Sequence, residues 1–311
     1  MPGVSAERPG GSFLRWQMDR RRDRPAWPKT WPATQSRPAE RVAGDALRVT
    51  YVGHATMLIQ TQGLNILTDP VWSARASPFT WIGPRRVNAP GIAFDDLPPL
   101  DLILLTHSHY DHMDSATLMR LAQVRPCRIL TPLGNDTILR AFRKPVTSEA
   151  FDWQASVDVA AGVRVHFEPT QHWSARNLRD RRMALWASFV IETPAGKILH
   201  IGDTGYGNGS IYRAIHRKHG GMRLAIIPIG AYEPRWFMRP QHVDPEESVR
   251  IFDDVDASFG FAHHWGTFRL TDEAIDEPPK RLAIALERAN IAPDRFAVRR
   301  PGETFDVPPR A

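Results

Sequence analysis

The sequence predicts an α/β protein, because strand-like and helix-like segments alternate along most of its 311 residues. Several of the short apolar runs are followed closely by a histidine or an aspartate. Hydrophobic residues make up 42% of the chain and charged residues 24%, which is ordinary for a globular protein with a large core. We expect one folded domain over residues 46–311, preceded by an extended arm over residues 1–45.

The predicted arm is rich in proline and arginine and shows neither a helical nor a strand period. Phe13, Leu14, Trp16 and Met18 stand among its arginines, a composition suited to peripheral contact with an anionic membrane. The alternative is that the arm packs its aromatic side chains onto the domain. The chain has no apolar run of membrane-spanning length and no apolar signal-peptide core, so we expect a cytoplasmic protein that touches membranes only at their surface.

The first half of the domain predicts strands and one helix. Residues 48–52, 56–60 and 65–69 are strand-like and separated by glycine-containing turns, which favours an antiparallel meander. Residues 71–99 lack any period and contain many prolines, glycines and tryptophans, as in long ordered loops that line sites. The apolar run 100–106 predicts a strand covered on both faces, and Asp114 is placed to cap a helix over residues 115–123.

The second half continues the alternation. Apolar runs predict strands over residues 163–168, 197–201, 224–229 and 258–262. Asp244 precedes Pro245 and two glutamates, which is typical of a capped helix start. A final helix is expected over residues 280–289.

Neither the net charge nor the cysteine content selects one class of function. A net charge of +6 and a pI near 9.8 would suit a polyanionic partner, but an arginine-rich composition explains them equally well. Cys127 is the only cysteine, so neither an intramolecular disulfide nor a cysteine-rich zinc site can form. We interpret Cys127 as a small buried hydrophobic residue.

The segment His107-Ser-His-Tyr-Asp-His112 carries the strongest chemical signal. It follows the apolar run 100–106 directly, and in an extended segment His107, His109 and Asp111 project to the same side. His112 then turns in at the start of the helix. Imidazole and carboxylate ligands suit Zn²⁺, and also Fe²⁺ or Mn²⁺.

Four ligands within six residues exceed what one ion needs. Three further candidates, His172, Asp203 and His264, follow later predicted strands. Together the seven residues suffice for two ions with a carboxylate between them. The sequence therefore predicts a dinuclear metal site.

The spacing and order of these residues resemble the metallo-β-lactamase superfamily. Motifs outside the histidine segment resemble its N-acyl-phosphatidylethanolamine phospholipase D family, over roughly residues 45–305. The matching segments are Thr50-Tyr-Val-Gly-His-Ala-Thr56, Leu67-Thr-Asp-Pro70, Ser73-Ala-Arg-Ala-Ser-Pro78, Gly202-Asp-Thr-Gly-Tyr206, 229–238, 241–247 and His264-Trp-Gly-Thr-Phe268. The resemblance implies a four-layer αββα sandwich with a dinuclear zinc site along one edge.

The resemblance also implies a role for each ligand. His107, His109 and His172 would hold one zinc ion. Asp111, His112 and His264 would hold the other, and Asp203 would bridge the two. His264 is preferred to its neighbour His263 because the family's ligand directly precedes a Trp-Gly pair. Asp111 and Asp203 are accordingly the catalytic carboxylates of a reaction in which a metal-bridging hydroxide attacks the substrate.

Five further residues are predicted to support this site. His242 matches a family position near the substrate, with structural packing as the alternative, and Gln241 and Tyr110 are the other expected substrate contacts. Asp69 is expected to orient a ligand histidine through a hydrogen bond, or else to form the turn before Pro70. His54 is expected either to support a metal ligand in a similar way or to form a hydrogen bond at the end of a turn.

The resemblance favours a phosphodiesterase of the phospholipase D type, acting on N-acyl-phosphatidylethanolamine or a related phospholipid. A lactone or thioester hydrolase is the alternative, because the same metal site can attack a carbonyl. A nuclease is disfavoured, since related nucleases carry a large insertion, and only 30 residues separate His172 from Asp203 and 60 separate Asp203 from His264. We therefore expect no nucleic-acid partner.

Overall fold

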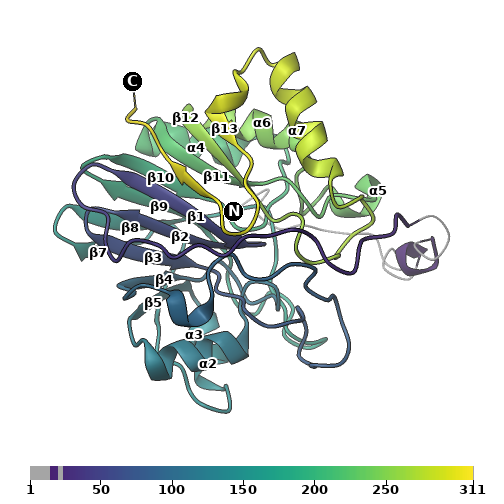
Figure 1. Cartoon of the computed structure of the whole chain (residues 1–311), viewed down its shortest axis with the longest axis horizontal. Helices are drawn as coiled ribbons and strands as arrows, with labels where there is room; N and C mark the ends of the chain where they lie inside the picture. The colour runs from purple at the N-terminus through teal and green to yellow at the C-terminus, as the bar shows by residue number, and fades with distance from the viewer. Residues whose placement is uncertain (1–14, 20–23, 311) are drawn as a thin grey trace.

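The computed structural model describes residues 15–19 and 24–310, which form two seven-stranded sheets with helices on their outer faces (Figure 1). The first sheet consists, in spatial order, of β14 (Thr304–Asp306), β1 (Leu47–Gly53), β2 (Thr56–Thr61), β3 (Leu64–Thr68), β4 (Leu102–Leu104), β5 (Arg128–Pro132) and β6 (Glu149–Phe151). The second consists of β13 (Phe296–Ala297), β12 (Ala257–His263), β11 (Met222–Pro228), β10 (Gly196–His200), β9 (Ser188–Thr193), β8 (Val163–Glu168) and β7 (Ser156–Ala160).

Three apolar clusters hold these layers together. The first lies between the two sheets, where alternate residues of β1–β3 face those of β8–β12. A second packs α4 (Ser210–His219), α6 (Pro245–Asp254) and α7 (Glu277–Arg288) onto the second sheet. A third packs α2 (Ser115–Val124) and α3 (Asn135–Arg140) onto the first sheet. The predicted αββα sandwich is therefore confirmed.

The observed elements follow the predicted ones with two informative differences. The strand expected over residues 100–106 is regular only at Leu102–Leu104. Backbone hydrogen bonds to the neighbouring strands extend to Asp101 and Leu105, but the Thr106 N–H donates to the Asp69 carboxylate instead. The last helix begins at Glu277, before the predicted residue 280, since prolines are tolerated in a first helical turn. Both predicted caps are present: the side chains of Asp114 and Asp244 each accept a backbone N–H of the following helix.

The arm lies along the domain where it is described. The backbone N–H groups of Trp31, Thr34 and Ser36 donate to carbonyls of residues 87, 301 and 91. The Trp16 indole is buried, stacks on Phe237 and donates to Asp272, as expected if the arm packs its aromatic residues on the domain. Met18 is exposed, and Phe13 and Leu14 lie outside the described residues. In the described part of the chain, no helix has both the length and the apolarity needed to span a membrane.

Arg223 of β11 joins the end of the arm to the C-terminal segment. Its guanidinium is buried and donates to the carbonyl oxygens of Asp45, Ala195, Val307 and Pro308 at 2.7–3.0 Å. We expect Arg223→Met to lower the free energy of unfolding by about 2 kcal/mol, because buried carbonyls lose a charged donor. Urea unfolding followed by circular dichroism measures this change.

Arg164→Met is the matched control. Arg164 forms an exposed pair with Asp158, and such pairs contribute less than about 1 kcal/mol. Equal losses of stability in the two variants would show that the Arg223 contacts add nothing beyond an ordinary surface pair.

Candidate metal centre

The seven predicted ligands converge at one end of the sandwich. His107, His109, Asp111 and His112 lie in the loop between β4 and α2. The other three, His172, Asp203 and His264, follow the ends of β8, β10 and β12. Because these strands end at the same edge, residues far apart in sequence meet there. Their ligand atoms form groups in which all members lie within 4.8 Å of one another.

The first group consists of His107, His109, His172 and Asp203. His109 Nδ1 lies 2.8 Å from His107 Nε2 and 3.3 Å from His172 Nε2. Asp203 Oδ2 lies 3.8 Å from His107 Nε2 and 3.6 Å from His172 Nε2. Three imidazole nitrogens facing one another cannot all be satisfied by hydrogen bonds among themselves, but a shared cation satisfies all of them.

The second group consists of Asp111, His112 and His264, with His54 beside them. His264 Nε2 lies 2.9 Å from Asp203 Oδ1 and 3.4 Å from Asp111 Oδ2. His112 Nε2 lies 3.3 Å from Asp203 Oδ2 and 3.6 Å from Asp111 Oδ2. Asp203 therefore contacts both groups, which is the position expected of a bridging carboxylate.

The outer nitrogens of three of these imidazoles are held by acceptors. Thr106 Oγ1 lies 2.9 Å from His107 Nδ1, Asp69 Oδ2 lies 2.8 Å from His112 Nδ1, and the Gln241 carbonyl lies 3.0 Å from His172 Nδ1. An Nδ1–H that donates outward leaves the Nε2 lone pair directed into the site. Metal-binding histidines require this arrangement, so the residues present fit a metal centre.

The electrostatics of the cluster favour cations. Burial lowers the pKa of His107 and His172 well below the ordinary value and that of His109 to about 4, so these imidazoles are neutral. Burial alone would raise the pKa of Asp203, but the adjacent His264 and His112 outweigh it and hold the pKa well below its usual range. Asp111 and Asp203 in turn outweigh burial and raise the pKa of His264 to about 9 and that of His112 well above its ordinary value, so these two imidazoles carry protons. Two buried, ionised carboxylates that retain protons on their neighbours form a site that attracts positive charge.

Asp69 makes the hydrogen bond expected of it. Its carboxylate is fully buried and also accepts from the backbone N–H and the hydroxyl of Thr106 at 2.8 and 2.7 Å. Thr106 Oγ1 thus donates to Asp69 while its lone pair faces His107. The sequence analysis did not predict a role for Thr106. Its position between a buried strand and the first histidine could have indicated one.

His54 contacts two of the predicted ligands, Asp111 through its side chain and His264 through its backbone. Its Nε2 lies 2.9 Å from Asp111 Oδ2, and its carbonyl accepts from the His264 N–H at 2.8 Å. Burial is the largest cause that lowers the pKa of His54 to about 3. The neutral ring therefore orients the Asp111 carboxylate without adding charge.

The three predicted substrate contacts lie in different surroundings. His242 Nδ1 lies 4.0 Å from Asp203 Oδ2, and its ring centre lies 5.3 Å from that of His172. Gln241 is buried, and its side-chain oxygen accepts from the Trp173 indole at 2.6 Å. The Tyr110 hydroxyl donates to the Arg176 carbonyl at 2.9 Å. The structure thus brings His242 to the cluster and engages the other two side chains within the protein; contact with substrate stays a prediction for all three.

His263 lies beside the cluster without joining it. Its ring nitrogens have no hydrogen-bond partner among the described residues, and its closest ring neighbour is His200, at 5.5 Å between centres. Neither residue belongs to the three candidate ligand groups found in the described chain. The preference for His264 over His263 agrees with this geometry.

Comparison with known proteins places the chain in a family. The β-lactamase superfamily domain model matches residues 64–265. An uncharacterised protein of Mycobacterium tuberculosis (strain H37Rv) is 38% identical over 85% of this chain and 70% of its own length. The N-acyl-phosphatidylethanolamine-hydrolysing phospholipase D 1 of Caenorhabditis elegans is 33% identical over 85% of this chain and 77% of its own length.

Solved structures agree on the fold. An isothiocyanate hydrolase from Delia radicum gut bacteria superposes with a TM-score of 0.65 at 19% identity, over 84% of this chain and 99% of that one. The sandwich, the paired His/Asp clusters at its edge and these relatives lead to one assignment. The chain is a metal-dependent hydrolase of the metallo-β-lactamase superfamily and belongs to the family that includes the N-acyl-phosphatidylethanolamine-hydrolysing phospholipases D.

Proposed function

We propose that this protein is a dinuclear metal phosphodiesterase that hydrolyses N-acyl-phosphatidylethanolamine or a related phospholipid. The observation that carries the proposal is the position of Asp203, whose two carboxylate oxygens reach both ligand groups. His107, His109 and His172 would hold one ion, and Asp111, His112 and His264 the other. The relatives named for this activity support the choice of substrate.

The donor set of five imidazoles and two carboxylates suits Zn²⁺, and also Fe²⁺ or Mn²⁺. Two such ions lower the pKa of a bound water and offset the negative charge of a phosphodiester. The chain's own contribution is orientation: Asp69, Thr106 and the Gln241 carbonyl fix three imidazoles, and His54 fixes Asp111. This preorganisation supports hydrolysis without a side-chain nucleophile.

A substrate screen after metal analysis tests the proposal. The purified protein is assayed against bis-p-nitrophenyl phosphate, N-acyl-phosphatidylethanolamine, a lactone and a thioester. We expect about two bound metal ions per chain and turnover of the two phosphodiesters. Turnover of the lactone or thioester without any phosphodiester turnover would reject the proposal in favour of a carbonyl hydrolase.

His242 offers a separate test of substrate contact. We expect His242→Gln to keep the metal content while raising KM for the lipid by roughly tenfold, because a polar contact to substrate is worth about 1–2 kcal/mol. Metal analysis and steady-state kinetics on the same preparation measure both. Loss of metal from the variant would instead make His242 a ligand, and unchanged kinetics would leave it a packing residue.

A further inference from the structure

The long loop between β3 and β4 contains a closed hairpin over residues 74–86. The Arg86 N–H donates to the Ala74 carbonyl and the Ala76 N–H to the Pro84 carbonyl, which closes its base. Inside the hairpin, the Arg75 guanidinium donates to the carbonyls of Thr80 and Gly83. These bonds give the turn a defined shape although it contains no helix or strand.

The tip of this hairpin exposes large apolar side chains. Phe79 is 53% exposed, Trp81 73% and Ile82 51%. The rings of Phe79 and Trp81 lie 5.6 Å apart. Apolar residues gathered on one exposed turn are costly in water and are characteristic of surfaces that meet a partner or a membrane. Tryptophan in particular prefers the boundary between water and lipid.

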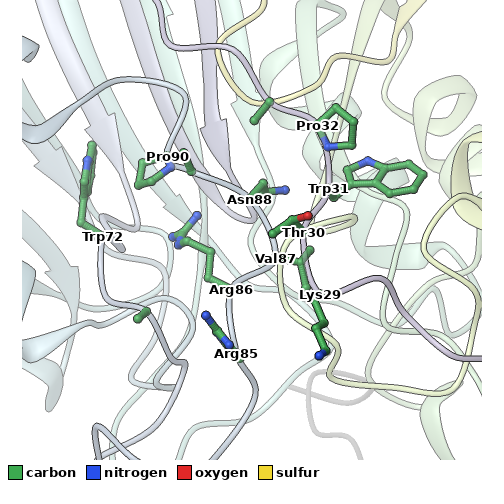
Figure 2. Close-up of a pocket in the computed structure, with 13 residues that line it drawn as sticks. Lys29, Thr30, Trp31, Pro32, Trp72, Arg85, Arg86, Val87, Asn88 and Pro90 are labelled. Carbon is green, nitrogen blue, oxygen red and sulfur yellow. The ribbon is translucent and has the colours of Figure 1, made fainter.

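The base of the same hairpin lines a cationic cavity of about 710 Å³. Figure 2 shows arm residues Lys29 to Pro32 on one side and Trp72, Arg85 and Arg86 on the other. None of the lining residues is acidic, and the chain has no Asp or Glu between Asp69 and Asp95. The cavity therefore combines positive charge with aromatic walls.

The cavity contains three cationic side chains, Lys29, Arg85 and Arg86. Among the described residues, no ion pair joins Lys29, Arg85 or Arg86 to an acidic side chain. The Arg86 guanidinium is buried, donates to the carbonyls of Val71 and Ser73, and packs 4.8 Å from the centre of the Phe268 ring. Positive charge without a direct ion pair, beside an exposed apolar turn, matches the surface of an anionic membrane, whose head groups are negative and whose interior is apolar.

We propose that the hairpin 74–86 docks the protein on membranes that carry anionic phospholipid. The tip residues Phe79, Trp81 and Ile82 enter the boundary of the bilayer, and the cavity at the base receives the anionic group of a lipid head group. The loop that leads into the hairpin is anchored to the helix that follows the ligand segment, because the backbone N–H groups of Trp72 and Ser73 donate to the side chains of Thr117 and Asp114. Docking in this way does not depend on the proposed reaction.

Vesicle co-sedimentation of the full chain tests this proposal. Vesicles of phosphatidylcholine are compared with vesicles that also contain phosphatidylglycerol. We expect stronger binding to the anionic vesicles, a loss of binding to both kinds in Trp81→Ser/Ile82→Ser, and a roughly thirtyfold weaker affinity for anionic vesicles in Lys29→Gln/Arg85→Gln.

Arg143→Gln/Arg217→Gln is the matched control, because both arginines are exposed and the variant removes the same charge away from the cavity. It should bind like the unmodified protein, and thermal unfolding should show that all variants fold. The proposal is overturned if the unmodified protein binds neither vesicle, or if the cavity variant binds anionic vesicles as well as the control variant does. Since no turnover is measured, the result stands apart from the outcome of the substrate screen.

Discussion

Asp203→Asn is expected to lower phosphodiesterase activity by roughly a hundredfold to a thousandfold and to reduce the bound metal. The substitution preserves the shape of the side chain but removes the charge that faces both ligand groups. His112 and His264 lie within 3.3 Å of the Asp203 carboxylate oxygens, and the other carboxylate of the cluster, Asp111, belongs to the second ligand group alone. Metal content and turnover of bis-p-nitrophenyl phosphate measure the effect.

Asp253→Asn serves as the matched control, because Asp253 is exposed on α6 and belongs to none of the candidate ligand groups. It should keep both metal and activity. If the Asp203 variant behaved in the same way, a mechanism that depends on two ions bridged by this carboxylate would be wrong.

Asp69→Asn is expected to weaken metal binding by about ten- to a hundredfold. The buried Asp69 carboxylate accepts from His112 Nδ1, which keeps the Nε2 lone pair directed into the site. An asparagine amide can turn its NH₂ toward His112, and the favoured tautomer then carries its proton on Nε2, where it blocks coordination. Competition with a chromophoric chelator measures the affinity.

The folding effect of Asp69→Asn is measured separately on metal-free protein. The carboxylate also accepts two hydrogen bonds from Thr106, so we expect a loss of about 1–3 kcal/mol in the free energy of unfolding. Unchanged metal affinity together with lower stability would assign Asp69 to the fold alone and remove it from the support of His112.

Several parts of the structure could be predicted because they depend on neighbours in sequence. The helix caps Asp114 and Asp244 act on N–H groups two or three residues away. The strand Val163–Glu168 was predicted with the bounds that the structure has, since period and β-branching are local. The short extent of the strand Leu102–Leu104 was not predicted. Its cause is a contact with a distant residue: the Thr106 N–H donates to the side chain of Asp69, which follows β3, and not to a neighbouring strand.

By itself, the sequence determined that imidazoles and carboxylates stand at the ends of apolar runs, and it determined the resemblance that assigns them to two ions. Only the tertiary structure decided that Asp203 lies between both groups, that Asp69 reaches His112, and that Gln241 supports His172 through its backbone. It also decided that the hairpin 74–86 and the arm meet around one cationic cavity. The physical reason is that these contacts join segments of different strands and loops, so they exist only once strand order and register bring distant residues to one edge.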